Sequence, residues 1–122
     1  MTAVPPAMRK VSEKAFQTAV IDLARSAGWL VGHLHDSRRQ VAPGKFVGDR
    51  DAAGLPDLIL VKGARLLLVE LKAEKGRLRP AQQQWIKALQ AVESDAAGRV
   101  MVREWRPSQW DEIVQLLTGR LA

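Results

Sequence analysis

Two short apolar runs on either side of one glycine constrain the fold of this chain more than any other feature. Leu58 to Val61 and Leu66 to Leu71 have the length and composition of strands, and Gly63 lies midway between them. Glycine at the first central position suits a two-residue type II′ turn, which predicts an antiparallel hairpin. If Gly63 and Ala64 form the turn, counting back along both strands brings Asp57 opposite Glu70.

Two carboxylates that face each other across a hairpin need a compensating charge. Directly opposed residues have Cβ atoms roughly 4.5 to 5.5 Å apart, and like charges so placed are destabilising. A divalent cation between Asp57 and Glu70 would remove that repulsion. Strand alternation puts Lys72 on the face of Glu70, beside the proposed ion. The alternative is that Glu70 and Lys72 form an ordinary solvated pair at a strand end, but the register with Asp57 favours a site.

The chemistry of such a site points to phosphoryl transfer. Hard oxygen ligands suit Mg²⁺, which takes one or two carboxylates, keeps several waters and leaves room for a substrate phosphate. The ion can polarise a phosphoryl oxygen and lower the pKa of a bound water. Lys72 could orient that water or neutralise charge on the phosphate. The segment therefore predicts a metal-dependent nuclease.

Composition agrees with a small nucleic-acid enzyme of one domain. No cysteine is present, which excludes disulfides, thiolate zinc sites and cysteine nucleophiles. The net charge of +6 and the pI near 10.3 imply attraction to polyanions, without choosing among DNA, RNA and acidic membranes. No apolar stretch approaches the about 18 residues of a membrane span, and the N-terminus has no apolar signal core. We expect a cytoplasmic protein.

The order of predicted elements indicates an α/β fold. We expect residues 1–10 to be a mobile tail and residues 11–122 to be one domain. Around the hairpin, the pattern predicts a helix over Val11 to Ala27, a strand over Trp29 to His35, a helix over Pro80 to Val92, a strand over Val100 to Trp105 and a final helix that begins with a capping box at Ser108 to Asp111. This order predicts a mixed β-sheet flanked by helices, with an αβββαβ core. Trp85 and Leu89 are expected in the core, and Trp105 and Trp110 in packing or a subunit interface.

Three further polar positions have two interpretations each. Glu13 lies in a first helical turn, where an acid is explained equally by the helix dipole and by an active-site role. Gln82 begins an apolar stripe, and it either bonds within the catalytic cluster or caps the helix. His33 shares a strand face with His35, and packing or phosphate contact is favoured over a metal pair because no third ligand has a telling spacing.

Two basic segments flank the hairpin. The connection from Asp36 to Ala53 exceeds the about 12 to 15 residues beyond which loops are usually functional or disordered, and the alternative is a solvated connection. A second cationic turn follows Lys72. We interpret these segments as nucleic-acid contacts, with the candidate residues Arg38, Arg39, Lys45, Arg50, Lys75, Arg77 and Arg79.

Taken together, these motifs resemble the PD-(D/E)xK nuclease superfamily and, within it, the VRR-NUC (virus-type replication-repair nuclease) group. The resemblance runs from about Ser12 to Trp110. It is carried by Glu13, Gly54-Leu-Pro-Asp57, Glu70-Leu-Lys72 and the stretch from Leu78 through Gln82 to Trp85. It implies a restriction-endonuclease-like fold that cuts phosphodiester bonds with Mg²⁺ or Mn²⁺.

The resemblance also implies a role for each matching residue. Asp57 and Glu70 become metal ligands, with the Leu71 carbonyl completing the site, and Lys72 assists the attacking water. Glu13 matches a helix acid that contacts the metal through water, and Gln82 matches the conserved glutamine of the family. The expected catalytic residues are thus Glu13, Asp57, Glu70, Lys72 and Gln82.

Small stand-alone members of the group are similar to phage and bacterial Holliday-junction resolvases, which work as homodimers. The resemblance therefore implies a homodimer that cuts branched DNA in a bacterial or phage-infected cell. Two alternatives stay open: an endonuclease for linear duplex, like a restriction enzyme, and a non-catalytic DNA-binding module on the same fold. RNA is disfavoured, because nothing resembles a single-strand module with paired stacking aromatics. The connection from Asp36 to Ala53 is longer than expected of the group, which leaves substrate preference open.

Overall fold

The chain forms a four-stranded mixed sheet between helices. The computed structural model describes residues 10–34, 39–42, 45–47 and 53–119, with only the backbone for 39–42 and 45–47. The elements are α2 (Glu13–Ser26), β1 (Leu30–His33), β2 (Arg39–Ala42), β3 (Lys45–Val47), β4 (Leu58–Lys62), β5 (Arg65–Leu71), α3 (Pro80–Asp95), β6 (Val100–Trp105), the 3₁₀ helix η2 (Pro107–Gln109) and α4 (Trp110–Thr118). The main sheet has the order β1-β4-β5-β6, in which only β5 and β6 are parallel.

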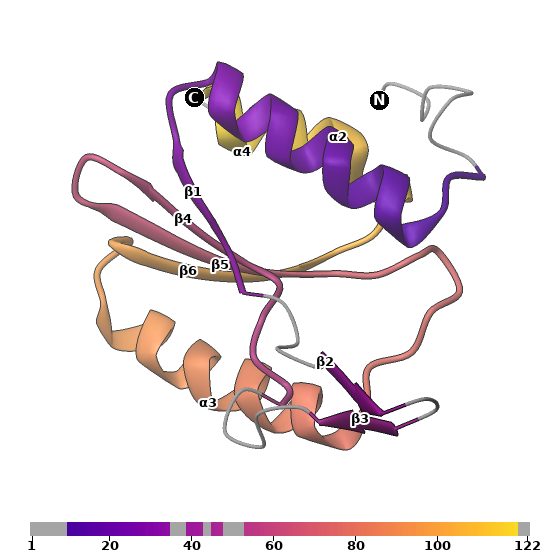
Figure 1. Ribbon diagram of the computed structural model, residues 1–122. Coiled ribbons are helices and arrows are strands. Elements are labelled where there is room, and N and C mark those ends of the chain that lie inside the picture. Colours follow the sequence, from indigo (N-terminus) through magenta and orange to yellow (C-terminus); the bar gives the residue numbers. More distant parts are fainter. Residues whose placement is uncertain (1–9, 35–38, 43–44, 48–52, 120–122) are drawn as a thin grey trace.

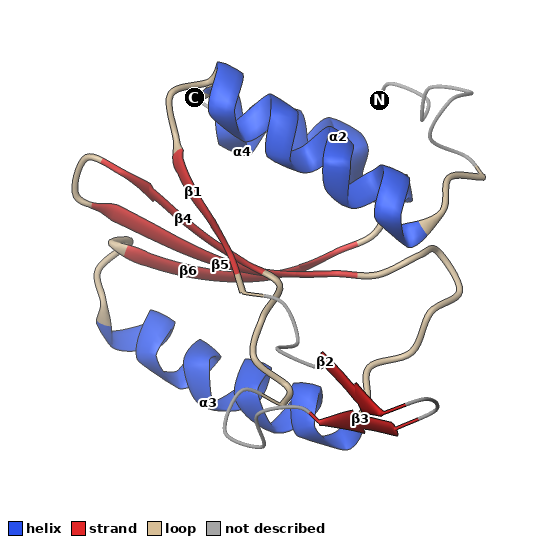
Figure 2. Cartoon of the chain, in the orientation of Figure 1, coloured by secondary structure: helices blue, strands red, loops and turns tan. Residues whose placement is uncertain are grey.

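The layers match the predicted α/β class. Figure 1 shows α2 and α4 on one face of the sheet and α3 on the other. The elements α2, β1, β4, β5, α3 and β6 supply the predicted αβββαβ core, in the order seen in Figure 2. The fold is therefore the restriction-endonuclease-like arrangement that the sequence predicted. Among the described residues, no helix is long and apolar enough to cross a membrane.

The β4–β5 hairpin has the predicted register. Val61 pairs with Leu66 and Ile59 with Leu68. Gly63 has a φ of 59°, the left-handed value that the first central residue of a type II′ turn requires. The residue that precedes β4 is Asp57, and the same register brings it opposite Glu70. The two acids thus reach one end of the hairpin through turn geometry and strand length.

The main core lies between the sheet and the α2–α4 layer. Strand alternation directs Leu67, Val69 and Leu71 of β5 into it, and helical spacing directs Phe16 and Val20 of α2 against them. Full burial of one such side chain contributes about 1.5 to 3 kcal/mol. The other face of β5 is left for Leu68 and Glu70, beneath α3. This division places an acid under a helix rather than in solvent.

The outer edge of β6 is covered by side chains. The Val102 N–H donates to the Glu93 carboxylate at 2.5 Å, and the Arg103 guanidinium donates to Glu93 at 2.9 Å and to the Val102 carbonyl at 2.8 Å. Blocked edge groups do not pair with another strand. Glu93 and Arg103 therefore protect the end of the sheet at its parallel strand.

The interpretation of residues 36–53 as a loop without strands is wrong in part. This segment contains β2 and β3, which pair antiparallel in a separate two-stranded sheet with an irregular register between Gln40 and Ala42. Pro43-Gly44 lies between the two strands in the sequence. A Pro-Gly dipeptide is a strong turn signal, and short segments on either side of it can pair.

Two side-chain predictions around the helices are also wrong. Trp85 is 38% exposed rather than in the core, because α3 buries Gln82 and Ile86 and leaves Trp85 at its flank. The last helix begins at Trp110 after the 3₁₀ turn, so Ser108 does not cap it. The Ser108 N–H instead donates to the Glu74 carboxylate at 3.0 Å. Trp105 packs in the core as predicted.

A leucine pair tests this placement of the core. Leu60 is fully buried, whereas Leu30 is 73% exposed on the edge strand β1. We expect Leu60→Ala to lower the free energy of unfolding by about 2 to 5 kcal/mol through lost burial and a residual cavity. Leu30→Ala should change it by less than about 0.5 kcal/mol. Urea denaturation measures both, and equal losses would contradict the assigned face of β4.

Candidate active site

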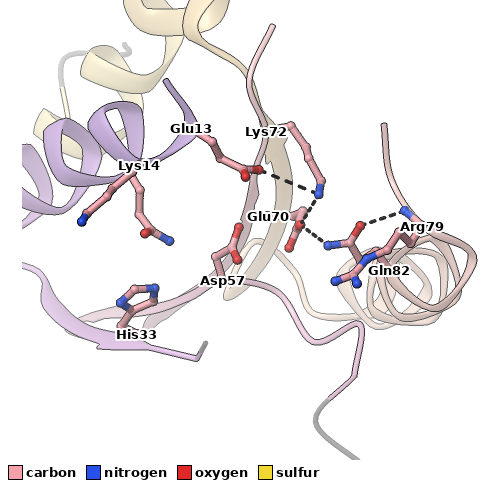
Figure 3. Close-up of a pocket in the computed structure, with 9 residues that line it drawn as sticks. Glu13, Lys14, His33, Asp57, Glu70, Lys72, Arg79 and Gln82 are labelled. Atoms are coloured by element: carbon pink, nitrogen blue, oxygen red, sulfur yellow. Dashed lines mark hydrogen bonds and ion pairs between the residues drawn. The ribbon is translucent and has the colours of Figure 1, made fainter. Parts of the chain in front are cut away.

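A cavity of about 320 Å³ opens at the end of the hairpin where Asp57 and Glu70 meet. Figure 3 shows that its side chains come from α2, β1, the hairpin and the start of α3. The lining residues are Glu13, Lys14, Gln17, His33, Asp57, Glu70, Lys72, Arg79 and Gln82. The cavity therefore collects polar side chains from segments that are far apart in the sequence.

Asp57 is held by the opposing strand and by a tight approach to α3. Its Oδ2 accepts a hydrogen bond from the Leu71 N–H at 2.8 Å. Upstream, Gly54 has a φ of 85°, and a Cβ there would lie 2.6 Å from the carbonyl carbon and oxygen of Ala81. Only glycine combines that backbone conformation with so close an approach. The segment before Asp57 therefore packs closely against the first turn of α3.

Glu70 is the most buried ionisable group of the cavity, with 1% of its surface exposed. Its Oε2 accepts from the Gln82 side chain at 2.8 Å and lies 3.6 Å from the Lys72 ammonium. Its Oε1 is buried and has no hydrogen-bond partner within the described part of the chain. Burial, followed by the charge of Asp57, raises the pKa of Glu70 to about 7 against the opposing effect of Lys72. The charged form of Glu70 therefore has fewer hydrogen-bond partners than its two oxygens can accept.

The pKa of Asp57 is displaced in the same direction. Burial raises it, and the Leu71 N–H, Lys72 and His33 oppose that rise without cancelling it. Two adjacent carboxyl groups with raised pKa values resist being charged together. The pair therefore favours any bound cation that would let both ionise.

Gln82 links Glu70 to the start of α3. Its Oε1 accepts from the Arg79 N–H at 2.8 Å while its Nε2 donates to Glu70. Because an N–H only donates and a carboxylate only accepts, these two partners define which way the amide points. Gln82 is thus both the helix cap and the cluster residue, the two interpretations that the sequence left open.

Lys72 lies between two acids at the mouth of the cavity. Its Nζ is 3.6 Å from Glu70 and 3.8 Å from the Oε1 of Glu13. Ser12 caps α2 by accepting from the Ala15 N–H at 3.1 Å, so the helix begins at Glu13 and presents that side chain to the cavity. Glu13 is about half exposed, and solvent weakens its attraction to Lys72. The active-site interpretation of Glu13 is therefore compatible with its position in the helix.

The structure brings the five predicted catalytic residues together around one cavity, with Arg79 beside them. Lys75 and Arg77 are exposed on the loop that follows β5 and do not line it. Arg38 and Arg50 lie outside the described residues. Arg39 and Lys45 belong to β2 and β3, of which only the backbone is described. Those four candidate contacts stay predictions.

Two lining residues, Lys14 and Gln17, had no assigned site role, and a third, His33, had packing or phosphate contact as its expected role. Lys14 and Gln17 extend from α2, and His33, for which the sequence favoured packing or phosphate contact, lies at the end of β1. Figure 3 shows Lys14 and His33 on the far side of Asp57 from Lys72. The sequence signal for Gln17 was its position one helical turn after Glu13, which puts both side chains on the same face of the helix. No pattern in the local sequence predicts that β1 lies beside the N-terminal end of α2.

The donor set fits a hard divalent cation. The unpartnered Oε1 of Glu70 and the raised pKa values of both acids indicate that Lys72 alone compensates the pair incompletely. In the described ranges, no group of three or more His, Asp and Glu side chains is arranged to hold a metal ion. Asp57 and Glu70 would therefore hold it with the Leu71 carbonyl, water and substrate oxygens, as Mg²⁺ sites commonly do.

Comparison with known families agrees with this geometry. The model of the VRR-NUC domain matches residues 33–101, more than half of the chain. The chain belongs to the VRR-NUC family. The match includes Asp57, Glu70, Lys72 and Gln82, whereas Glu13 lies before it. A VRR-NUC domain is a nuclease of the PD-(D/E)xK type, so the predicted family is confirmed. A search of curated proteins and a search of solved structures found no match.

The close approach of Gly54 to α3 can be tested by comparison with another glycine that has a positive φ. Gly98 also has a positive φ, of 81°, but a Cβ there would meet nothing within 4 Å. Gly98→Ala should cost only backbone strain, about 1 to 2 kcal/mol of unfolding free energy. Gly54→Ala should cost a further ~1 to 3 kcal/mol, because the segment must move away from Ala81. Equal losses of unfolding free energy in urea denaturation would show that a Cβ at position 54 does not collide with Ala81.

The raised pKa of Glu70 predicts how the stability of the metal-free protein depends on pH. The folded pKa of about 7 exceeds the ordinary 4.5, so the folded state binds the extra proton between these values. This contribution is fully present below about pH 4.5 and is lost as pH rises through about 7, by up to about 3 kcal/mol. Urea denaturation in EDTA from pH 4.5 to 8 measures it. Glu70→Gln should flatten the profile, and an equally steep profile would assign it to another group.

Proposed function

We propose that this protein is a metal-dependent, structure-selective DNA endonuclease that cuts branched DNA as a homodimer, in the manner of a Holliday-junction resolvase. The observation that carries the proposal is the cavity at the hairpin end. There the family-matched Asp57, Glu70 and Lys72 meet, and the one ammonium of Lys72 does not offset the burial of both acids. A site that needs a cation and faces solvent is suited to a reaction on a phosphate.

The proposed reaction is attack of water on the phosphodiester, in line with the leaving oxygen. A bound Mg²⁺ or Mn²⁺ supplies polarisation of the phosphoryl oxygen and acidification of a water. Asp57 and Glu70 would hold that ion, and the hydrogen bond from Gln82 orients the Glu70 carboxylate. The Lys72 ammonium, held between Glu70 and Glu13, donates to the attacking water and offsets charge that develops on the phosphate.

The opposite wall of the cavity has a binding role in this proposal. Lys14, Gln17 and His33 carry nitrogen donors and line the cavity. Lys14 and His33 lie on the side of Asp57 away from Lys72 (Figure 3). Donors of this kind suit phosphate oxygens on either side of the cut bond. Lys75 and Arg77, exposed outside the cavity, extend the positive surface along the DNA. The net charge of +6 supports a polyanionic substrate.

The preference for a branched substrate rests on symmetry and on the family resemblance. Each chain has one set of the proposed catalytic residues, whereas a four-way junction presents two equivalent strands. A dimer with two-fold symmetry would supply two sets for two symmetric cuts. We place this activity with bacterial or phage DNA, in the cytoplasm.

A cleavage assay with matched carboxylate variants tests the proposal. Purified protein is incubated with labelled four-way junction, flap, linear duplex and single-stranded DNA in Mg²⁺, Mn²⁺ or EDTA. We expect paired nicks across the junction that require metal. Asp57→Asn and Glu70→Gln should each lower the cleavage rate by roughly 10²-fold or more, the scale of a lost electrostatic contact to the transition state. Asp22→Asn, an exposed acid of α2 outside the cavity, should cleave at the wild-type rate.

The outcomes separate the candidate functions. Wild-type cleavage by a folded Asp57→Asn protein would refute the assigned site. Cutting of linear duplex alone would indicate a restriction-like endonuclease. Binding of all substrates without cutting in either metal would indicate a non-catalytic DNA-binding module.

A further inference from the structure

One arginine outside the cavity holds the backbone of the loop that borders it. Residues 72–79, here called the basic loop, connect β5 to α3. The Nη1 of Arg106 donates to the carbonyl oxygens of Ala73 at 2.8 Å, Glu74 at 3.2 Å and Gly76 at 2.6 Å. Its Nη2 donates to the Glu104 carboxylate at 2.7 Å. One guanidinium therefore donates to three loop carbonyls and also to a side chain of β6, that of Glu104.

A second contact secures the same turn. The Glu74 carboxylate accepts from the Ser108 N–H at 3.0 Å, and the Gly76 N–H closes the turn on the Ala73 carbonyl at 2.9 Å. The loop is therefore attached to the segment after β6 in two places. Short loops with exposed cationic side chains otherwise sample many conformations.

The two ends of the basic loop are held in other ways. The Lys72 N–H donates to the Trp105 carbonyl at 3.0 Å, and its side chain is paired with Glu70 and Glu13. At the far end, the Arg79 N–H donates to Gln82. Between these points lie the exposed side chains of Lys75 and Arg77. Arg106 holds the middle of the loop by its backbone carbonyls, and the Ser108 N–H adds one contact to the side chain of Glu74.

We propose that Arg106 is a positioning residue that fixes the basic loop, so that Lys75 and Arg77 are already in place when DNA enters the cavity. This inference rests on the proposed function, because it assigns the loop to the substrate of that site. Arg106 itself touches loop carbonyls and Glu104, not the cavity. Without Arg106 the loop must become ordered on binding, and that cost appears in the affinity for DNA.

The geometry requires arginine in particular. A guanidinium presents donors in a fixed plane, so Nη1 and Nη2 can serve the loop and Glu104 at once. A lysine ammonium at this position can reach some of the carbonyls but cannot reproduce both sets together. Arg106→Lys should therefore restore part of the function that Arg106→Gln loses. Arg103 of β6 offers a matched control, because it is also paired with a glutamate, Glu93 of α3, but its contacts are with Glu93 and Val102 and not with the basic loop.

The first test is limited proteolysis of the DNA-free protein. Trypsin cleaves after Lys75 and Arg77, which lie inside the basic loop. We expect Arg106→Gln to be cut faster at these two positions by roughly tenfold or more, since local opening exposes the backbone. Arg106→Lys should be intermediate, and Arg103→Gln should match wild type at both positions. Peptide mass identifies the sites, and urea denaturation of each variant separates local opening from global unfolding.

The second test is DNA binding and turnover at several salt concentrations. We expect Arg106→Gln to raise KM roughly tenfold, the cost of ordering a few side chains, with kcat within about twofold of wild type. The salt dependence of binding should keep the wild-type slope, because Lys75 and Arg77 still reach phosphates once bound. If Arg106 itself contacted a phosphate, the slope would fall by about one.

The two tests fail in different ways. Wild-type cleavage at Lys75 and Arg77 in Arg106→Gln would overturn the positioning role whatever the protein does with DNA. A reduced salt slope, or loss of kcat with unchanged KM, would overturn it as well. Faster proteolysis in a protein that binds no DNA would confirm that Arg106 holds the loop while refuting the proposed function.

Discussion

The register of the β4–β5 hairpin is the constraint on which the site depends. A shift of one residue would reverse the two faces of β5, send Glu70 into the apolar layer and bring Val69 under α3. Two features prevent that shift. Gly63 accepts the positive φ that closes the turn, and the three leucine and valine positions of the other face are buried against α2 and α4. The placement of the acids is thus a consequence of packing on the side of the sheet that they do not touch.

Glu70 shows what this placement costs the metal-free fold. Its side chain is under α3 with one neutral donor, Gln82, and an ammonium at 3.6 Å. A buried carboxylate with so little compensation is unfavourable, which is why its pKa is raised. An apolar residue there would suit the sheet better and could hold no ion. Local conflict with an otherwise consistent fold is typical of functional positions.

The sequence predicted what depends on local periodicity and missed what depends on how elements meet. The hairpin register, the αβββαβ order of the core and the meeting of Asp57 with Glu70 follow from short-range rules, and all were confirmed. Trp85 was misplaced because periodicity cannot tell which part of the stripe of α3 the sheet will cover. Lys14 and Gln17 were missed because their position at the cavity depends on how α2 crosses the sheet. The Pro43-Gly44 dipeptide is a turn signal in the sequence, but the length of the connection favoured a loop without strands.

Gln82 in the cavity and Arg106 outside it hold backbone in a similar way. Each is a long side chain with several donors or acceptors, each is placed by an element after the hairpin, and each bonds to backbone in or next to the basic loop. Backbone groups carry no sequence signature, so such contacts cannot be inferred from the identity of the residues that they hold. Apolar contacts could not replace them, because exposed loop carbonyls would lose water without gaining a donor. The two acids of the cavity are therefore placed by the hairpin, whereas the position of the basic loop depends on Arg106, which is 30 to 33 positions from the loop residues that it holds.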